Sequence, residues 1–186
     1  TPPRIALVGQ TFNDVRNVMV EGESGLLACH RDDERPVFEP SKRRVSWSNG
    51  AIAELFSADE REALRGPQFT HAWCDEVAKW REAQAAWDML QFALRLGAAP
   101  QVVATTTPRA TAFVKGLIAD AATATTRLAT TDNAENLAPS FIAEMARRYA
   151  GSSLGRQELF GEIVDDQSDA LWRRGWISET RAARAP

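Results

Sequence analysis

The chain has 186 residues, which is enough for one domain with a buried core, or for one domain and part of another. Its composition, 44% hydrophobic and 25% charged, is typical of a globular protein, and its net charge of −3 excludes nucleic-acid binding through overall positive charge. No stretch approaches the roughly 18 apolar residues of a transmembrane helix. The two cysteines, Cys29 and Cys74, fit no metal-binding spacing and indicate a reducing, intracellular setting.

Strands and helices are expected to alternate along the chain. Residues 4–9 (RIALVG) predict a buried strand, and Thr11 is placed to cap a helix over about 12–21, before a loop at 31–41. The elements expected after residue 57 are a short charged helix at 58–65, a strand at 70–74, a helix at 83–96, a strand at 101–106, a helix at 109–121, a strand at 126–131 and a helix at 139–150.

A β-hairpin is expected over residues 43–48 and 51–56. Asn49-Gly50 lies between the two strands, and this dipeptide favours a tight turn because both turn positions require positive φ. A two-residue loop would place Trp47 opposite Ile52.

The alternation predicts an α/β fold with a mostly parallel sheet, flanked by helices and carrying the β-hairpin. In such sheets, ligands bind beyond the carboxyl ends of the strands. Three places follow from that rule: the turn after Gly9, the pair Asp75-Glu76, and residues 105–108.

The pair Asp75-Glu76 ends a short strand in the segment FTHAWCDEVAKW. Two adjacent carboxylates suit nucleotide hydrolysis, because one can hold Mg²⁺ while the next orients or deprotonates the attacking water. The alternative is a strand that leaves the core with two polar residues, and the pair alone does not decide between them.

The segment VVATTTP is an apolar strand that ends in the hydroxyls of Thr105, Thr106 and Thr107. Hydroxyls beside a γ-phosphate can sense its presence through hydrogen bonds. The alternative is that they satisfy the strand end and that Thr107 caps the next helix. Two polar strand ends at this spacing favour a shared site over coincidence.

No G-x-x-x-x-G-K-[ST] phosphate-binding loop occurs in the 186 residues. The three lysines, Lys42, Lys79 and Lys115, lie in no glycine-rich loop. We therefore expect that the phosphate loop precedes residue 1 in a longer parent protein.

Several segments, in order, resemble the ATPase domain of the large terminase subunit, the DNA-packaging motor of tailed phages, and the likeness is closest to the packaging proteins of gene transfer agents. They are RIALVGQTFNDVRNVMVEGESGLL, VSWSNGAIAELFSADEREALRGPQF, CDEVAKW, ATTTPR and YAGSSLGRQELFGEIVDD. They resemble, respectively, the part after the Walker A helix, the hairpin with its Leu-Arg-Gly turn, Walker B, the coupling motif and the end of the domain.

The resemblance implies a P-loop-type (ASCE/RecA-like) fold and a role for each matching residue. Asp75 would be the Walker B aspartate that binds magnesium, Glu76 the catalytic glutamate, and Thr105–Thr107 the coupling motif. Arg65 would be an arginine finger acting on a neighbouring subunit's ATP, with Arg109 and Arg156 as lesser candidates. The alternative for Arg65 is a surface ion pair or a cation at a helix C-terminus.

The resemblance also implies ATP and Mg²⁺ as cofactors and, as partners, double-stranded DNA, the portal, the small terminase subunit and a ring of identical subunits. It implies the cytoplasm of a bacterial cell, with a phage or prophage gene. Residues 1–164 would be an N-terminally truncated ATPase domain, and residues 165–186 a linker toward a missing nuclease domain. The chain alone is therefore expected to hydrolyse ATP poorly or not at all.

Two other functions remain open on the sequence. A helicase-like NTPase also pairs a strand-end Asp-Glu with a hydroxyl-rich motif, and a non-catalytic assembly module could have a degenerate NTPase fold. Arg43 and Arg44 could contact DNA phosphates, or they could form an ordinary solvated face.

Overall fold

The structure, a computed structural model, describes residues 2–164 and residue 180. It divides into two compact units, 1–106 and 107–186. The expected linker at 165–186 lies, except for Thr180, outside the described residues, so the boundary at residue 165 stays a prediction.

The first unit contains all strands of the sheet. Its elements in chain order are β1 (Arg4–Gly9), α1 (Phe12–Asp14), the π-helix η1 (Val15–Val20), α2 (Leu26–Cys29), β2 (Val37–Glu39), the 3₁₀ helix η2 (Pro40–Lys42), β3 (Arg44–Ser46), β4 (Ile52–Ser57), the 3₁₀ helix η3 (Ala58–Leu64), β5 (His71–Cys74), the 3₁₀ helix η4 (Val77–Lys79), α3 (Ala83–Ala93) and β6 (Gln101–Ala104).

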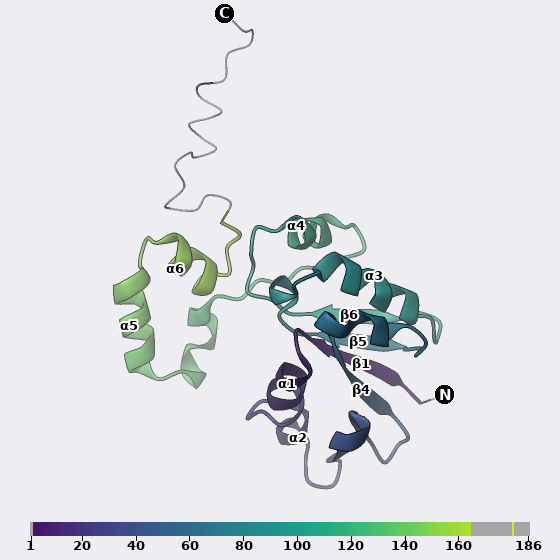
Figure 1. The fold of residues 1–186 in the computed structure, drawn as a ribbon. Helices are drawn as coiled ribbons and strands as arrows, with labels where there is room; N and C mark the ends of the chain where they lie inside the picture. The colour runs from purple at the N-terminus through teal and green to yellow at the C-terminus, as the bar shows by residue number, and fades with distance from the viewer. Residues whose placement is uncertain (1, 165–179, 181–186) are drawn as a thin grey trace, which may run out of the picture. The chain divides into compact units, whose positions relative to one another are not determined.

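The six strands form one sheet in the order β2-β3-β4-β1-β5-β6. Strands β4, β1, β5 and β6 are parallel to one another, and β2 and β3 extend the sheet through antiparallel pairs. Helices flank the sheet, with α3 on one side of it and α1 and α2 on the other (Figure 1). The mostly parallel α/β sheet expected from the sequence is confirmed.

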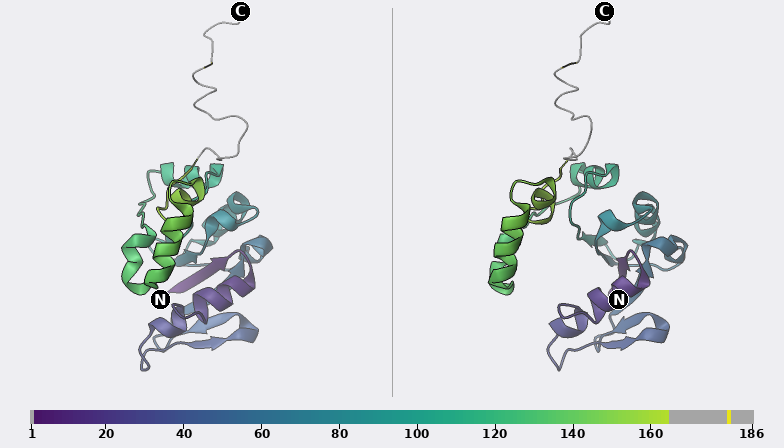
Figure 2. Two further views of the ribbon diagram at one scale, coloured as in Figure 1. Left: turned by 90° about the vertical axis from the view of Figure 1, so that its left-hand side faces the viewer. Right: turned by 60° about the vertical axis from the view of Figure 1, so that its left-hand side comes forward.

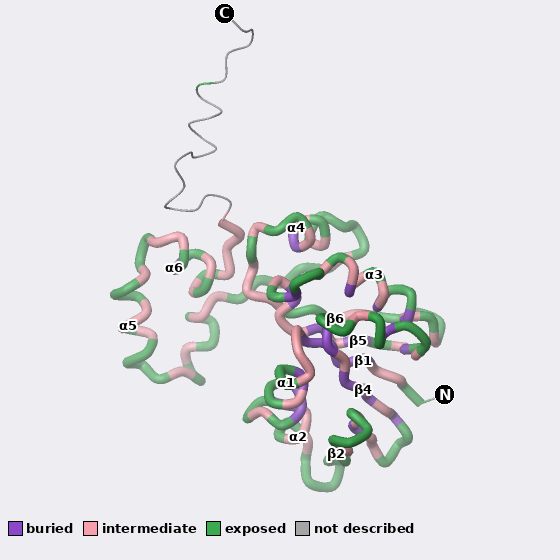
Figure 3. Tube along the Cα trace, viewed as in Figure 1, coloured by how far each residue is buried: buried purple, intermediate pink, exposed green. Residues whose placement is uncertain are grey.

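The core lies on both faces of β1 because its side chains alternate. Leu7 joins a buried cluster with Val15 and Met19 of η1 and Leu55 of β4. The neighbouring Ala6 and Val8 are fully buried on the other face. Figure 3 shows this concentration of buried residues along β1 and its neighbours. The buried strand β1 thus anchors the centre of the sheet, whereas the edge strand β6 is mostly exposed.

The hairpin is confirmed, but its register differs from the expected one. Ser46 pairs with Ile52, and the Trp47 amide donates to the Ala51 carbonyl at 3.0 Å, so the loop has three residues, not two. Trp47 therefore lies opposite Ala51. Gly50 has a φ of +86° at the end of this loop, the position where a three-residue hairpin loop needs the left-handed region.

Residues 31–41 are not only a loop, because β2 lies within them and pairs with β3. Two prolines, Pro36 and Pro40, flank this three-residue edge strand and obscure the strand pattern in the sequence.

The second unit contains α4 (Ala112–Ala119), the 3₁₀ helix η5 (Thr130–Asn136), α5 (Pro139–Tyr149) and α6 (Ser153–Glu158), drawn from teal to yellow-green in Figure 2. The helix expected at 139–150 is confirmed, with Pro139 in its first turn. The strand expected at 126–131 is wrong. No partner strand pairs with this segment in the described part of the chain, and Leu128 is 73% exposed, so β propensity alone does not produce a strand there.

Among the described residues, no helix is long and apolar enough to span a membrane.

His30, which follows α2, is tied to the hairpin by its two ring nitrogens. The Trp47 indole N–H donates to His30 Nε2 at 2.9 Å, and His30 Nδ1 lies 2.6 Å from the Leu26 carbonyl oxygen. The indole can only donate, so Nε2 is the acceptor and the proton is on Nδ1.

We expect His30→Ala and Trp47→Phe each to lower the free energy of unfolding by about 1 kcal/mol, because each breaks this hydrogen bond. A double-mutant cycle followed by urea denaturation should give a coupling of roughly 0.5–1.5 kcal/mol. His71→Ala, at an exposed histidine of β5, serves as the control and should be additive with Trp47→Phe. Additivity of His30→Ala with Trp47→Phe would contradict the bond.

Candidate functional site

The two polar strand ends found in the sequence meet at one edge of the sheet. Strands β5 and β6 are parallel and in register, with Cys74 opposite Ala104, so Asp75 and Thr105 follow as neighbours. Thr105 Oγ1 donates to Asp75 Oδ1 at 2.6 Å, and the Thr105 amide donates to the Cys74 carbonyl at 2.9 Å. The two strand ends thus meet as predicted, and the side chains of Thr105 and Asp75 are in direct contact.

Thr106 contacts the turn that follows Asp75-Glu76. Its Oγ1 accepts a hydrogen bond from the Ala78 amide at 3.1 Å, and the Val77 amide donates to the Thr105 carbonyl at 3.1 Å. Thr105 and Thr106 therefore accept hydrogen bonds from two consecutive amides, those of Val77 and Ala78. Thr107 is the first residue of the second unit, and its role stays a prediction. The next helix is capped by Thr111, whose side chain accepts from the Val114 amide, and not by Thr107.

Glu76 adopts a left-handed backbone conformation, with φ 51° and ψ 48°. For a residue with a Cβ this costs roughly 1–2 kcal/mol, and such strain persists only where neighbouring bonds fix it. The Trp80 indole supplies one of these bonds by donating to the Asp75 carbonyl at 3.1 Å, and Trp80 is only 4% exposed. Lys79 Nζ lies 3.8 Å from Glu76 Oε2. No pattern in the sequence indicates these roles for Trp80 and Lys79.

Cys74 precedes the acidic pair and is fully buried. Burial raises the pKa of the Cys74 thiol, and the neighbouring Asp75 charge raises this pKa further. The thiol therefore stays protonated at neutral pH, and it is neither a nucleophile nor a soft metal ligand.

The oxygens at this edge fit magnesium better than a transition metal. Within the residues that the structure describes, no three His, Cys, Asp or Glu side chains gather into a metal-binding group. Mg²⁺ is commonly held by one or two carboxylates together with phosphate oxygens and water, and the Asp75 carboxylate with the Thr105 hydroxyl beside it provides hard oxygen donors. Asp75 is partly exposed, so its carboxylate is accessible to such an ion.

The turn after Gly9, the third expected place, is a helix start. Thr11 caps α1 through a reciprocal capping box with Asp14, as the sequence predicted. The preceding Gln10 carbonyl accepts from Ser57 Oγ at 2.8 Å and thereby joins the ends of β1 and β4.

Arg65 lies away from the acidic pair within its own unit. It follows η3 and lines a shallow hollow with residues at the carboxyl end of α3, including Phe92 and Arg95. Its Nε is 3.0 Å from Glu62 Oε2, and both side chains are 67% exposed, so this surface ion pair contributes little to stability. Arg65 does not reach Asp75 of the same chain, which leaves the expected action on a neighbouring subunit as a prediction.

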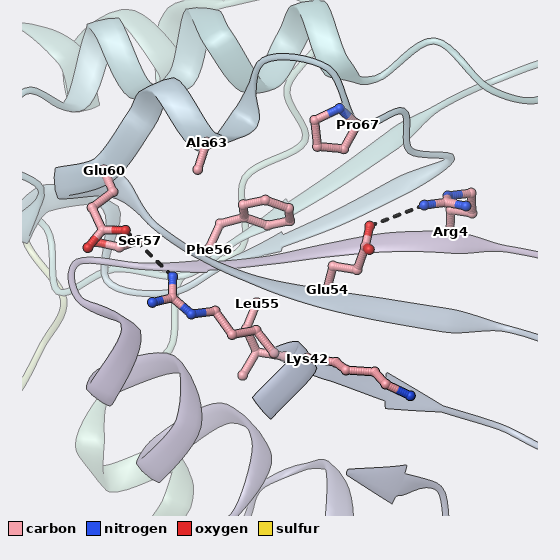
Figure 4. Close-up of a pocket in the computed structure, with 10 residues that line it drawn as sticks. Arg4, Lys42, Glu54, Leu55, Phe56, Ser57, Glu60, Ala63 and Pro67 are labelled. Carbon is pink, nitrogen blue, oxygen red and sulfur yellow. Dashed lines mark hydrogen bonds and ion pairs between the residues drawn. The ribbon is translucent and has the colours of Figure 1, made fainter. Parts of the chain in front are cut away.

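A second hollow, of about 280 Å³, lies over β4; it contains none of the predicted catalytic, coupling or metal-binding residues, but Arg43 lines it. Figure 4 shows Phe56 in this hollow, with the ion pair of Arg4 and Glu54 to one side of it. Arg43 pairs with Glu60 at 3.5 Å. Arg44 also pairs with Glu54, at 3.6 Å. Arg43 and Arg44 are thus paired within the protein, which favours the solvated-face interpretation over DNA contact.

Residues 1–179 match the family model described as the N-terminal part of the T4likevirus-type terminase large subunit. The large terminase of a thermophilic bacteriophage, in complex with ADP, has a TM-score of 0.69 at 15% identity, over 88% of this chain and 41% of that chain. The complex of the same terminase with ATP-γ-S gives a TM-score of 0.66 at 14% identity, over 88% and 40% of the two chains.

The ATPase domain of the Thermus phage P74-26 large terminase gives a TM-score of 0.54 at 14% identity, over 87% of this chain and 77% of that chain. These similarities establish a common fold. The chain spans about two fifths of the terminase that was solved with ADP. No curated protein matches it.

We predict that Glu76→Gly raises the free energy of unfolding by up to about 1 kcal/mol, because glycine removes the left-handed strain at a smaller entropic cost. Urea denaturation of the 186-residue chain measures this change. Gln91→Gly is the matched control, since Gln91 lies in α3 and the same change there should cost about 1 kcal/mol. Equal destabilisation by both substitutions would contradict a strained Glu76.

Proposed function

We propose that this chain, which belongs to the T4likevirus-type terminase large-subunit family, forms part of an ATPase. This ATPase would drive DNA into a phage or phage-like capsid. The observation that carries the proposal is the contact of Thr105 with Asp75. It brings a carboxylate pair and a hydroxyl-rich strand end together at the sheet edge where α/β proteins bind nucleotides. The ADP and ATP-γ-S complexes of the thermophilic bacteriophage terminase support the same assignment.

In this proposal the two carboxylates have different tasks. Asp75, with the Thr105 hydroxyl on one of its oxygens, would hold Mg²⁺, and the ion would supply charge stabilisation at the phosphates. A carboxylate has enough lone pairs to accept the threonine bond and bind an ion together.

Glu76, one residue later and with a left-handed backbone, would accept the proton of the attacking water. The strained conformation of Glu76 supports a role for this residue that differs from that of Asp75. The Thr105 hydroxyl, at 2.6 Å from Asp75 Oδ1, and the Trp80 indole, at 3.1 Å from the Asp75 carbonyl, support this strand end.

The larger assembly is also part of the proposal. The subunits would form a ring on the procapsid with the portal and the small terminase subunit, in the cytoplasm of a bacterial cell, and contact double-stranded DNA through its phosphates. Phosphate contacts fit a motor that must accept any sequence. The gene would come from a phage, a prophage or a gene transfer agent.

We expect the isolated 186-residue chain to hydrolyse ATP poorly, since its sequence lacks a glycine-rich phosphate loop. A longer parent protein with such a loop should hydrolyse ATP, and Glu76→Gln should lower its kcat by about 10²–10⁴-fold, the usual range for loss of a general base. ATP binding by that variant, measured by calorimetry, should be retained. Robust Glu76-dependent turnover by the isolated chain would contradict the first expectation, and full activity of Glu76→Gln the second.

We expect Arg65→Ala to reduce the ATPase rate of the assembled parent by up to about 10³-fold if this arginine acts across subunits. Mixing the Arg65→Ala and Glu76→Gln variants should then restore part of the activity, because some interfaces contain both intact groups. Arg95→Ala, at a neighbouring arginine of the same hollow, is the control. No restoration on mixing, with both variants assembled, would favour the surface ion pair with Glu62 instead.

A further inference from the structure

The 3₁₀ turn η4, which follows Glu76, lacks a cap from its own residues. Glu76 occupies the N-cap position, yet its side chain makes no capping hydrogen bond. The first amides of a helix have no partner inside the helix and need acceptors from elsewhere. Here those acceptors come from the end of β6: the Thr105 carbonyl for Val77 and the Thr106 hydroxyl oxygen for Ala78.

The remaining bonds of the turn are local. The Lys79 amide donates to the Glu76 carbonyl at 2.8 Å, and the Trp80 amide donates to the Val77 carbonyl at 3.3 Å. These bonds close the turn on itself but do not attach it to the sheet. The bonds from β6 and the Trp80 indole attach it, so they hold Glu76 in its strained conformation.

The side chains of the two threonines therefore contact different parts of the segment, although the Thr105 carbonyl also accepts from the Val77 amide. The Thr105 hydroxyl contacts the Asp75 carboxylate directly, whereas the Thr106 hydroxyl contacts the Ala78 amide in the turn that follows Glu76. We propose that Thr106 is a positioning residue for Glu76, acting as the helix cap of η4, and that Thr105 is a positioning residue for Asp75. This inference rests on the proposed function. It assigns a different task to the side chain of each of these two threonines in the expected coupling motif.

The first test uses the isolated chain and needs no activity. Amide hydrogen exchange followed by NMR should show that Thr106→Val speeds exchange at Ala78 by about tenfold, because the hydrogen bond to its amide is lost. Thr106→Ser keeps the hydroxyl and should restore protection. Thr105→Val should leave Ala78 protected, and the Asp75 amide, bonded to the Val8 carbonyl, is the internal reference.

The second test uses the ATPase of the longer parent protein. Thr106→Val should lower kcat by about 10–100-fold at unchanged half-saturation by Mg²⁺, since small misplacement of a catalytic group has effects of this size. Thr106→Ser should recover most of the rate. Thr105→Val should raise the Mg²⁺ concentration for half-saturation at least fivefold. Thr111→Val, which removes a similar threonine cap from α4 in the second unit, is the control for a purely structural loss.

The outcomes distinguish failure of the proposed ATPase function from failure of the roles proposed for Thr105 and Thr106. If Glu76→Gln keeps full activity, the proposed function fails. If Glu76→Gln is inactive but Thr106→Val and Thr105→Val change kcat and Mg²⁺ dependence alike, or if Thr106→Val leaves Ala78 protected, the division of tasks between the threonines is wrong.

Discussion

The hydrogen bond from the Thr105 hydroxyl to the Asp75 carboxylate is the contact on which the site depends. It joins residues 30 positions apart in the chain, and it forms because β5 and β6 are parallel and end at the same level. That level is set by the register of β5 against β6, and β5 is itself aligned with the buried central strand β1. A slip of one residue in β6 against β5 would turn the Thr105 side chain to the face opposite Asp75 and break the bond.

The same edge of the sheet contains a strained residue, Glu76, close to the buried core. Glu76 holds an unfavourable backbone conformation, and its turn is attached to the sheet by the Trp80 indole and by the end of β6. Strain of this kind is found where a side chain must point in a direction that a relaxed backbone would not give it. In the proposed function, Glu76 and Asp75 have separate tasks, and the left-handed backbone of Glu76 is the feature that distinguishes it from its neighbour.

The sequence predicted the parallel sheet and the convergence of its strand ends, because buried strands and polar strand ends are local patterns. It also placed the hairpin, but not its register, since the choice between a two- and a three-residue loop depends on packing around Trp47 and His30. It could not predict the Trp80 bond or the capping by Thr106, which depend on distances between separate segments. The false strand at 126–131 had the right residue types but no partner strand among the described residues.

The most direct test is a crystal structure of the longer parent protein with Mg²⁺ and ATP-γ-S. The account predicts the ion within coordination distance, about 2.0–2.1 Å or one bridging water, of the Asp75 carboxylate. The Glu76 carboxylate should lie beside the γ-phosphate, with the Thr105 bond to Asp75 retained. Nucleotide bound elsewhere, with Asp75 and Glu76 away from the phosphates, would contradict the assignment of this sheet edge as the hydrolytic site.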